Sequence, residues 1–187
     1  MNTTETRFPL LPYRTIAKRW RRPAFLMIPA GIALYWALPL LWGEERPLAL
    51  LAFIPSLVGV LIFIYTRLAG RAHVSYHYNR FVVHTPLYPI AFSYQRVEMI
   101  KTVEFRALFP PEREKAARWR FYHDLWGRTV PTISLKDYPL PLWWLRLWLH
   151  PFLLHPKETG LVIPVEEWMT FVRRIEVQRT TWRLNRR

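Results

Sequence analysis

Two apolar segments, residues 24–42 and 48–66, constrain the fold of this chain most strongly. Each has 19 residues without a charged side chain, and only residues 43–47 separate them. As helices they would be about 28 Å long at 1.5 Å per residue, close to the roughly 30 Å of a bilayer's hydrocarbon core. The pattern predicts a transmembrane hairpin. Two core helices of a globular domain are the weaker alternative, because such helices usually keep a polar face.

Basic side chains lie outside both apolar segments, and the loop between the segments is acidic. Residues 43–47 contain two Glu and one Arg, while the flanks carry Arg14, Lys18, Arg19, Arg21, Arg22, Arg67 and Arg71. Positive charge normally stays on the cytoplasmic side of a membrane. We therefore expect a multi-pass inner (plasma) membrane protein with both termini cytoplasmic, in which residues 1–23 form a basic cytoplasmic segment.

The residues expected of a catalytic centre are missing from the sequence. There is no cysteine, which excludes disulfides and thiolate sites. No glycine-rich phosphate loop, GxSxG elbow or HExxH motif occurs. His73 and His77 share one face of a predicted strand, but no carboxylate pair accompanies them. We expect no enzymatic activity, no cofactor and no metal; a membrane enzyme with an unrecognised site is a remote alternative.

After residue 70 the sequence changes to short stretches in which apolar and polar residues alternate. This period of two indicates half-buried β-strands. The predicted strands are residues 73–78, 81–85, 90–94, 97–105, 129–135 and 160–164. A helix is expected from Pro111 to about Trp126. The last helix is expected from Pro164, with Phe171 and Ile175 on its apolar stripe.

The order of these elements resembles that of small bacterial membrane proteins that carry a pleckstrin-homology-like (PH-like) domain behind two transmembrane helices. The stretches VSYHYNRFVV, PIAFSYQRVEMIKTVEF and GLVIPVEEWMTFVRRIE carry the resemblance. It implies an α+β fold, in which a transmembrane hairpin precedes a PH-like antiparallel β-barrel or sandwich capped by a C-terminal amphipathic helix. The implied divisions are a PH-like cytoplasmic domain at 71–178, insertions at 110–127 and 138–156, and a basic tail at 179–187.

The resemblance also implies a membrane-linked interaction, but not a particular lipid. Eukaryotic relatives bind phosphoinositides through basic residues that flank the first β-hairpin. The corresponding turn here offers only Arg80, so phosphoinositide binding at that turn is not supported.

Residues 139–156, PLPLWWLRLWLHPFLLHP, are unusually rich in tryptophan and leucine. Three prolines, Arg146 and His150 interrupt the apolar run at residues 138–154, and an arginine at mid-membrane costs about 2.5–3.5 kcal/mol. A helix between Pro141 and Pro151 would place Arg146 and His150 on one face, as in a helix that lies in the membrane interface. The predicted membrane-interface residues are Trp143, Trp144, Arg146, Trp148 and His150. A partner contact, a place in the domain core and an extended conformation stay open as alternatives.

The C-terminal region carries an excess of arginine beyond what topology requires. A basic residue near an anionic leaflet contributes about 1 kcal/mol. The predicted contacts with anionic lipid or a partner are Arg173, Arg174, Arg179, Arg183, Arg186 and Arg187. The expected partners are the anionic headgroups of the bilayer and, as a second possibility, a membrane protein. Nucleic acid is a weak alternative.

These observations favour a non-catalytic, membrane-anchored interaction or assembly module. Its PH-like domain would contact the cytoplasmic leaflet, a protein partner, or both. The alternative is an accessory subunit of a larger membrane complex, packed through the transmembrane hairpin.

Overall fold

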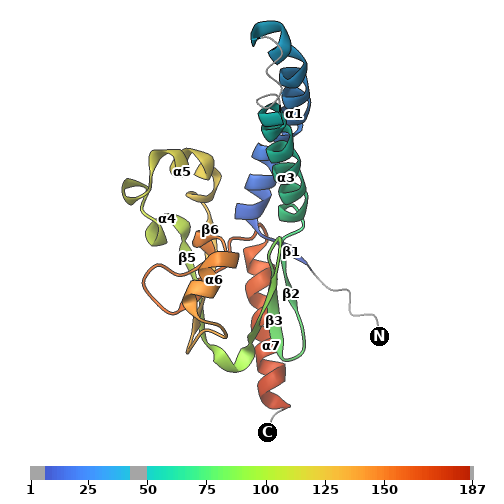
Figure 1. Ribbon diagram of the computed structural model, residues 1–187. Helices are drawn as coiled ribbons and strands as arrows, with labels where there is room; N and C mark the ends of the chain where they lie inside the picture. Colours follow the sequence, from blue (N-terminus) through green and yellow to red (C-terminus); the bar gives the residue numbers. More distant parts are fainter. Residues whose placement is uncertain (1–6, 43–49, 186–187) are drawn as a thin grey trace. The chain divides into compact units, whose positions relative to one another are not determined.

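The computed structural model of this protein describes residues 7–42 and 50–185 (Figure 1). The chain divides into two compact units. Residues 16–70 form a helical unit. The residues up to Thr15, together with Arg71–Arg187, form a mixed α/β unit.

The helical unit contains most of α1 (Leu11–Trp42), the short 3-10 helix η1 (Leu50–Phe53) and α3 (Ile54–Ala69). The backbones of α1 and α3 approach closely at Gly59, where an added Cβ would lie 2.9 Å from Met27 Cβ. One turn away, the hydroxyl of Ser56 donates a hydrogen bond of 2.6 Å to the carbonyl of Ile28. A small residue and a hydroxyl therefore set the spacing of this helix pair.

The predicted membrane topology is contradicted by the helices that form. Within residues 7–42 and 50–185, no helix is long and apolar enough to cross a membrane. The segment 48–66 does not form one helix, because η1 precedes an α3 of 16 residues, about 24 Å in length. The segment 24–42 is the second part of α1, whose first part is strongly basic. The expected multi-pass localisation is corrected accordingly; the predicted turn at 43–47 lies outside the described residues.

Two antiparallel sheets build the mixed unit, which confirms the predicted α+β class (Figure 1). The first sheet has the order β1-β2-β3-β4, formed by Phe8–Pro9, His73–Tyr76, Arg80–His84 and Pro89–Ser93. The second has the order β5-β6-β7, formed by Val97–Glu104, Thr129–Leu135 and Gly160–Val162.

Apolar cross-strand pairs fix the register of the first sheet. Val74 lies opposite Val83, and Phe81 lies opposite Phe92 with stacked rings 5.3 Å apart. All four side chains are buried. A shift of one residue would turn these side chains to the other face of the sheet, so burial selects this register.

The N-terminal strand β1 was not expected from the sequence, because residues 1–23 read as a basic segment. Phe8 pairs with Val74, which places β1 at the edge of the first sheet. Immediately afterwards, Leu10 forms a β-bridge with Val165, and the Leu11 amide donates to the Pro164 carbonyl. The N-terminus thereby joins β2 to the chain that follows β7.

The C-terminal helix α7 (Trp168–Leu184) packs with Phe171 and Ile175 fully buried. Phe171 contacts the rings of Phe8 and Tyr76, and the Tyr76 hydroxyl donates to the Phe171 carbonyl. The helix begins four residues later than predicted, because the backbone at 164 and 165 is paired with the N-terminal segment.

Short helices occupy the insertion between β5 and β6. They are α4 (Phe105–Leu108), η3 (Pro111–Arg113), α5 (Ala116–Phe121) and η4 (His123–Leu125). The single helix predicted from Pro111 to Trp126 is therefore wrong. The backbone is extended at Glu114 and Lys115, which separates η3 from α5.

Candidate functional site

The tryptophan-rich stretch folds as a short helix, α6 (Leu142–Trp148), followed by the 3-10 helix η5 (Pro151–Leu153). Leu145 is fully buried and anchors α6 to the domain. On the other side of the helix, Trp143 is 67% exposed and Leu147 is 64% exposed. The helix thus presents large apolar side chains to its surroundings.

A row of aromatic rings continues from α6 onto the loop between β3 and β4. The ring centroids are 5.4 Å apart for Trp143 and Trp144, 5.7 Å for Trp144 and Trp148, and 6.0 Å for Trp148 and Tyr88. We call these four residues the aromatic ridge. Trp143 and Tyr88 are its exposed ends, and Trp144 and Trp148 are half-buried between them. The exposed Leu87 extends the apolar surface beside Tyr88.

Arg146 is the charged residue of α6, and its side chain is exposed. It forms no hydrogen bond or ion pair with any other residue in the described part of the chain. An arginine on an apolar surface commonly packs its methylene groups there and holds its guanidinium in a polar layer. Arg146 is placed for such an arrangement.

His150 lies in a different environment from the exposed residues of α6. Its ring is enclosed by Tyr13, Tyr122 and Phe152, with centroid distances of 5.9, 5.1 and 5.2 Å. Helix α6 ends before it, at Trp148, so the predicted shared helical face with Arg146 does not form. His150 therefore belongs to the interior beneath the ridge, and its predicted place at the membrane interface is corrected.

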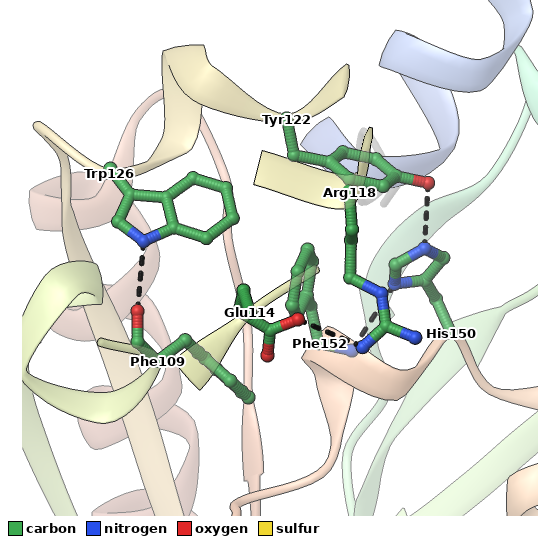
Figure 2. Close-up of polar contacts among 7 residues, drawn as sticks. All are labelled: Phe109, Glu114, Arg118, Tyr122, Trp126, His150 and Phe152. Carbon is green, nitrogen blue, oxygen red and sulfur yellow. Dashed lines mark hydrogen bonds and ion pairs between the residues drawn. The ribbon is translucent and has the colours of Figure 1, made fainter. Parts of the chain in front are cut away.

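Figure 2 shows the hydrogen bonds that hold this imidazole. The Phe152 amide donates to Nδ1 at 3.2 Å, and Nε2 lies 2.8 Å from the Tyr122 hydroxyl. A neutral imidazole carries one N–H, so acceptance at Nδ1 leaves Nε2 protonated and donating to Tyr122. Burial, and then the positive charge of Arg118, lowers the pKa of His150 to about 4. His150 is neutral at physiological pH.

The insertion packs against the same cluster (Figure 2). The Trp126 indole N–H donates to the buried carbonyl of Phe109 at 2.8 Å. Arg118 forms an ion pair of 3.0 Å with Glu114, and its guanidinium carbon lies 5.9 Å from the centre of the Phe152 ring. These contacts join the insertion at 110–127 to the one at 138–156.

Tyr13 ties the ridge to the N-terminal segment. Its hydroxyl donates to the Trp148 carbonyl at 3.1 Å and accepts from the His150 amide at 2.9 Å. The backbone that follows α6 is therefore fixed by Tyr13, and the imidazole of His150 is held by Tyr122. The exposed residues of α6 sit on a preorganised platform.

The arginines of α7 divide into two groups. Arg173, Arg174 and Arg183 are exposed. Arg179 instead donates through Nη2 to the carbonyls of Val97 and Glu98, both at 2.7 Å. Burial, and then the charge of Arg183, lowers the pKa of Arg179 from its usual value. Arg179 is therefore an internal contact between α7 and β5, while Arg186 and Arg187 lie outside the described residues.

The sequence grouped His73 and His77 on one strand, but β2 ends at Tyr76, before His77. His73 stacks on His84 across β2 and β3, with ring centroids 4.4 Å apart, and His84 Nε2 lies 3.0 Å from the Ser75 hydroxyl. Within residues 7–42 and 50–185, no group of three or more His, Asp or Glu side chains is arranged to hold a metal ion.

Sequence reasoning missed the part of this surface contributed by Leu87 and Tyr88. Both precede Pro89 in a turn, where exposed aromatics give no periodic signal. No protein family, curated protein or solved structure matches this chain.

Proposed function

We propose that this protein is a non-catalytic interaction module that binds anionic lipid headgroups through the exposed end of α6. The observation that carries the proposal is the combination of Trp143 and Leu147, both about two-thirds exposed, with the unpaired cation of Arg146 between them. Tryptophan favours the headgroup level of a bilayer. An adjacent arginine would then meet phosphate at the same depth.

The architecture supports the further proposal that the mixed unit is PH-like. Two antiparallel sheets are followed by one long C-terminal helix that packs through Phe171 and Ile175. The helix pair precedes strands β2 to β7, as the resemblance of the sequence leads us to expect. Fold alone does not specify function, so the assignment rests on the α6 surface.

The expected strength of this contact is modest. Transferring one large apolar side chain from water contributes about 1.5–3 kcal/mol, and one basic residue near an anionic leaflet about 1 kcal/mol. Trp143, Leu147 and Arg146 together supply an interaction of the order that a single lipid chain provides, which is reversible. Binding through this surface should therefore respond strongly to salt and to single substitutions.

The test compares vesicle binding of the full-length protein and two variants. Trp143→Ser combined with Leu147→Ser should weaken co-sedimentation with phosphatidylglycerol-containing vesicles at least tenfold, with little change in melting temperature because both side chains are exposed. Met169→Ser is the matched control, since Met169 is 68% exposed on α7. Equal binding by the double variant and the control would refute the proposal.

A second candidate is an accessory subunit that docks through the helix pair. The described parts of α1 and α3 expose many large apolar side chains, among them Leu26, Trp36, Leu57 and Leu61, at 58–72%. Extended apolar surfaces of this kind mark interaction sites. A photo-cross-linking residue at Trp36 should then form one discrete adduct with a protein partner, whereas the same residue at Met169 should not.

A further inference from the structure

A small cavity lies at the junction of the two sheets, away from the ridge and its supporting cluster. The 3-10 helix η2 (Tyr94–Arg96) connects β4 to β5 there, and residues 136–137 follow the end of β6. The cavity has a volume of about 250 Å³ and is lined by Gln95, Arg96, Lys136 and Asp137. All four lining side chains are polar or charged, and the cavity is open to solvent, since Gln95, Lys136 and Asp137 are exposed and Arg96 is half-buried.

Short hydrogen bonds tie the two sides of this cavity together. Arg96 Nη1 donates to Asp137 Oδ2 at 2.7 Å and to the Tyr138 carbonyl at 2.8 Å. The Lys136 amide donates to the Arg96 carbonyl at 2.9 Å. The guanidinium is therefore held in place before any ligand arrives.

Several donors in the cavity have no partner among the described residues. Arg96 uses only Nη1, which leaves its Nε and Nη2 groups without a protein acceptor. The Lys136 ammonium and the Gln95 side-chain amide form no hydrogen bond with the described part of the chain either. With Asp137 already bound to Arg96, the four side chains carry one net positive charge.

This combination selects a small, singly charged oxyanion. A guanidinium fork and an ammonium group are the usual ligands of phosphate oxygens. The volume lies below the 300–1,000 Å³ of sites for drug-sized molecules, so a headgroup-sized ligand fits better than a nucleotide. The single net charge matches a phosphodiester, and the second oxygen of Asp137 can accept a hydrogen bond from a headgroup hydroxyl or ammonium.

We propose that the cavity formed by Gln95, Arg96, Lys136 and Asp137 binds the phosphodiester of a phospholipid headgroup. This inference rests on the proposed function of the α6 surface and assigns it a headgroup site. The two lie close along the chain, because Trp143 follows Asp137 by six residues, which span at most about 20 Å.

The first part of the experiment uses a diester without lipid tails, so that the cavity is tested independently of the ridge. Glycerophosphoglycerol is titrated into the full-length protein, and the amide NMR signals of Gln95, Lys136 and Asp137 are followed. We expect saturable shifts whose Kd rises at least fivefold in Lys136→Gln. Lys101→Gln, which removes the same charge from an exposed position of β5, should leave the Kd within twofold. Absence of shifts, or equal Kd values in both variants, overturns the cavity as a site.

The second part separates a lipid from a free phosphate as the source of the ligand. Phosphatidylglycerol vesicles should bind Lys136→Gln more weakly than Lys101→Gln, and inorganic phosphate should bind more weakly than glycerophosphoglycerol. Tighter binding of inorganic phosphate, or equal vesicle binding by the two variants, overturns the lipid assignment. Failure of the wild-type protein to bind vesicles would refute the proposed function, while the diester titration would still decide whether the cavity is a site.

Discussion

Acidification should destabilise the mixed unit through one residue, His150. The folded protein holds this imidazole neutral, with a pKa lowered to about 4 first by burial and then by Arg118. In the unfolded chain the pKa returns to its ordinary value of 6.5. Between these two values the unfolded state binds a proton that the folded state does not. The neutral ring therefore favours folding fully above pH 6.5, and this stability is lost as the pH falls towards 4.

The size of the stability loss follows from the difference between the folded and unfolded pKa values of His150. Each pH unit between the two pKa values changes the free energy of unfolding by about 1.4 kcal/mol. At pH 5, which is 1.5 units below the unfolded value, His150 should have lowered the stability by about 2 kcal/mol relative to pH 7.5. Below pH 4 both states are protonated, and the contribution of His150 stops changing.

The variant His150→Asn tests how much the protonation of His150 contributes to the pH dependence of stability. The Asn side-chain oxygen can replace Nδ1 as the acceptor for the Phe152 amide, and Asn is favoured at the first position of a helical turn. Asn does not titrate, so the difference in unfolding free energy between wild type and variant should shrink by about 2 kcal/mol from pH 7.5 to pH 5. Tyr122→Phe is the control that keeps the imidazole buried, and it should retain the wild-type pH dependence.

Urea denaturation followed by tryptophan fluorescence at several pH values measures these differences. The ¹⁵N shifts of the imidazole give the pKa directly and report the tautomer, which should carry its proton on Nε2. The reasoning is refuted if wild type and His150→Asn have parallel stability profiles within about 0.5 kcal/mol. A measured pKa near 6.5 would refute it as well.

Two further substitutions test the packing of this unit by urea denaturation. Gly160→Ala should lower the free energy of unfolding by about 1–3 kcal/mol, because the new Cβ would lie 2.6 Å from the Ile133 carbonyl oxygen in β6. In the control Gly127→Ala, the new Cβ meets no atom within 4 Å, so the change should be close to neutral. Equal effects of the two substitutions would contradict the close approach at Gly160. Trp126→Phe should lower the free energy of unfolding by about 1–3 kcal/mol more than Trp148→Phe does. The first change leaves the buried Phe109 carbonyl without its donor, whereas the Trp148 indole N–H is buried without a partner among the described residues. A larger loss for Trp148→Phe would count against this assignment.

The strands of the mixed unit were predictable because their signal is local. The alternation at 129–135 gave the bounds of β6, and the predicted strands at 90–94 and 97–105 differ from β4 and β5 by one residue at their ends. The strand β1 was not predictable. Two residues have no periodicity, and Phe8 is in a strand because Val74, far along the chain, offers it a partner.

The tryptophan-rich stretch shows the same limit at the level of single side chains. A helix between Pro141 and Pro151 was one of the predicted conformations, and α6 forms within these bounds with Arg146 exposed, but it ends at Trp148. Whether each aromatic ring is buried or exposed depends on residues far away in the sequence. Tyr13, Tyr122 and Phe152 enclose His150, and Tyr88 contacts Trp148. Of the three tryptophans of α6, Trp143 is exposed and the other two are half-buried.

The pairing of the N-terminal segment determines when this protein can finish folding during synthesis. The Tyr13 hydroxyl bonds the His150 amide, 137 positions along the chain, and Leu10 forms its bridge with Val165. Residues 10–13 therefore wait until the region around residues 150–165 has been synthesised before they acquire their partners, and closing so long a loop is slow. During that interval α1 and α3 can already form, because their contacts are closer in sequence. The nascent chain would then present a folded helix pair before its sheets are complete, and it would be most exposed to aggregation and to chaperones at that stage.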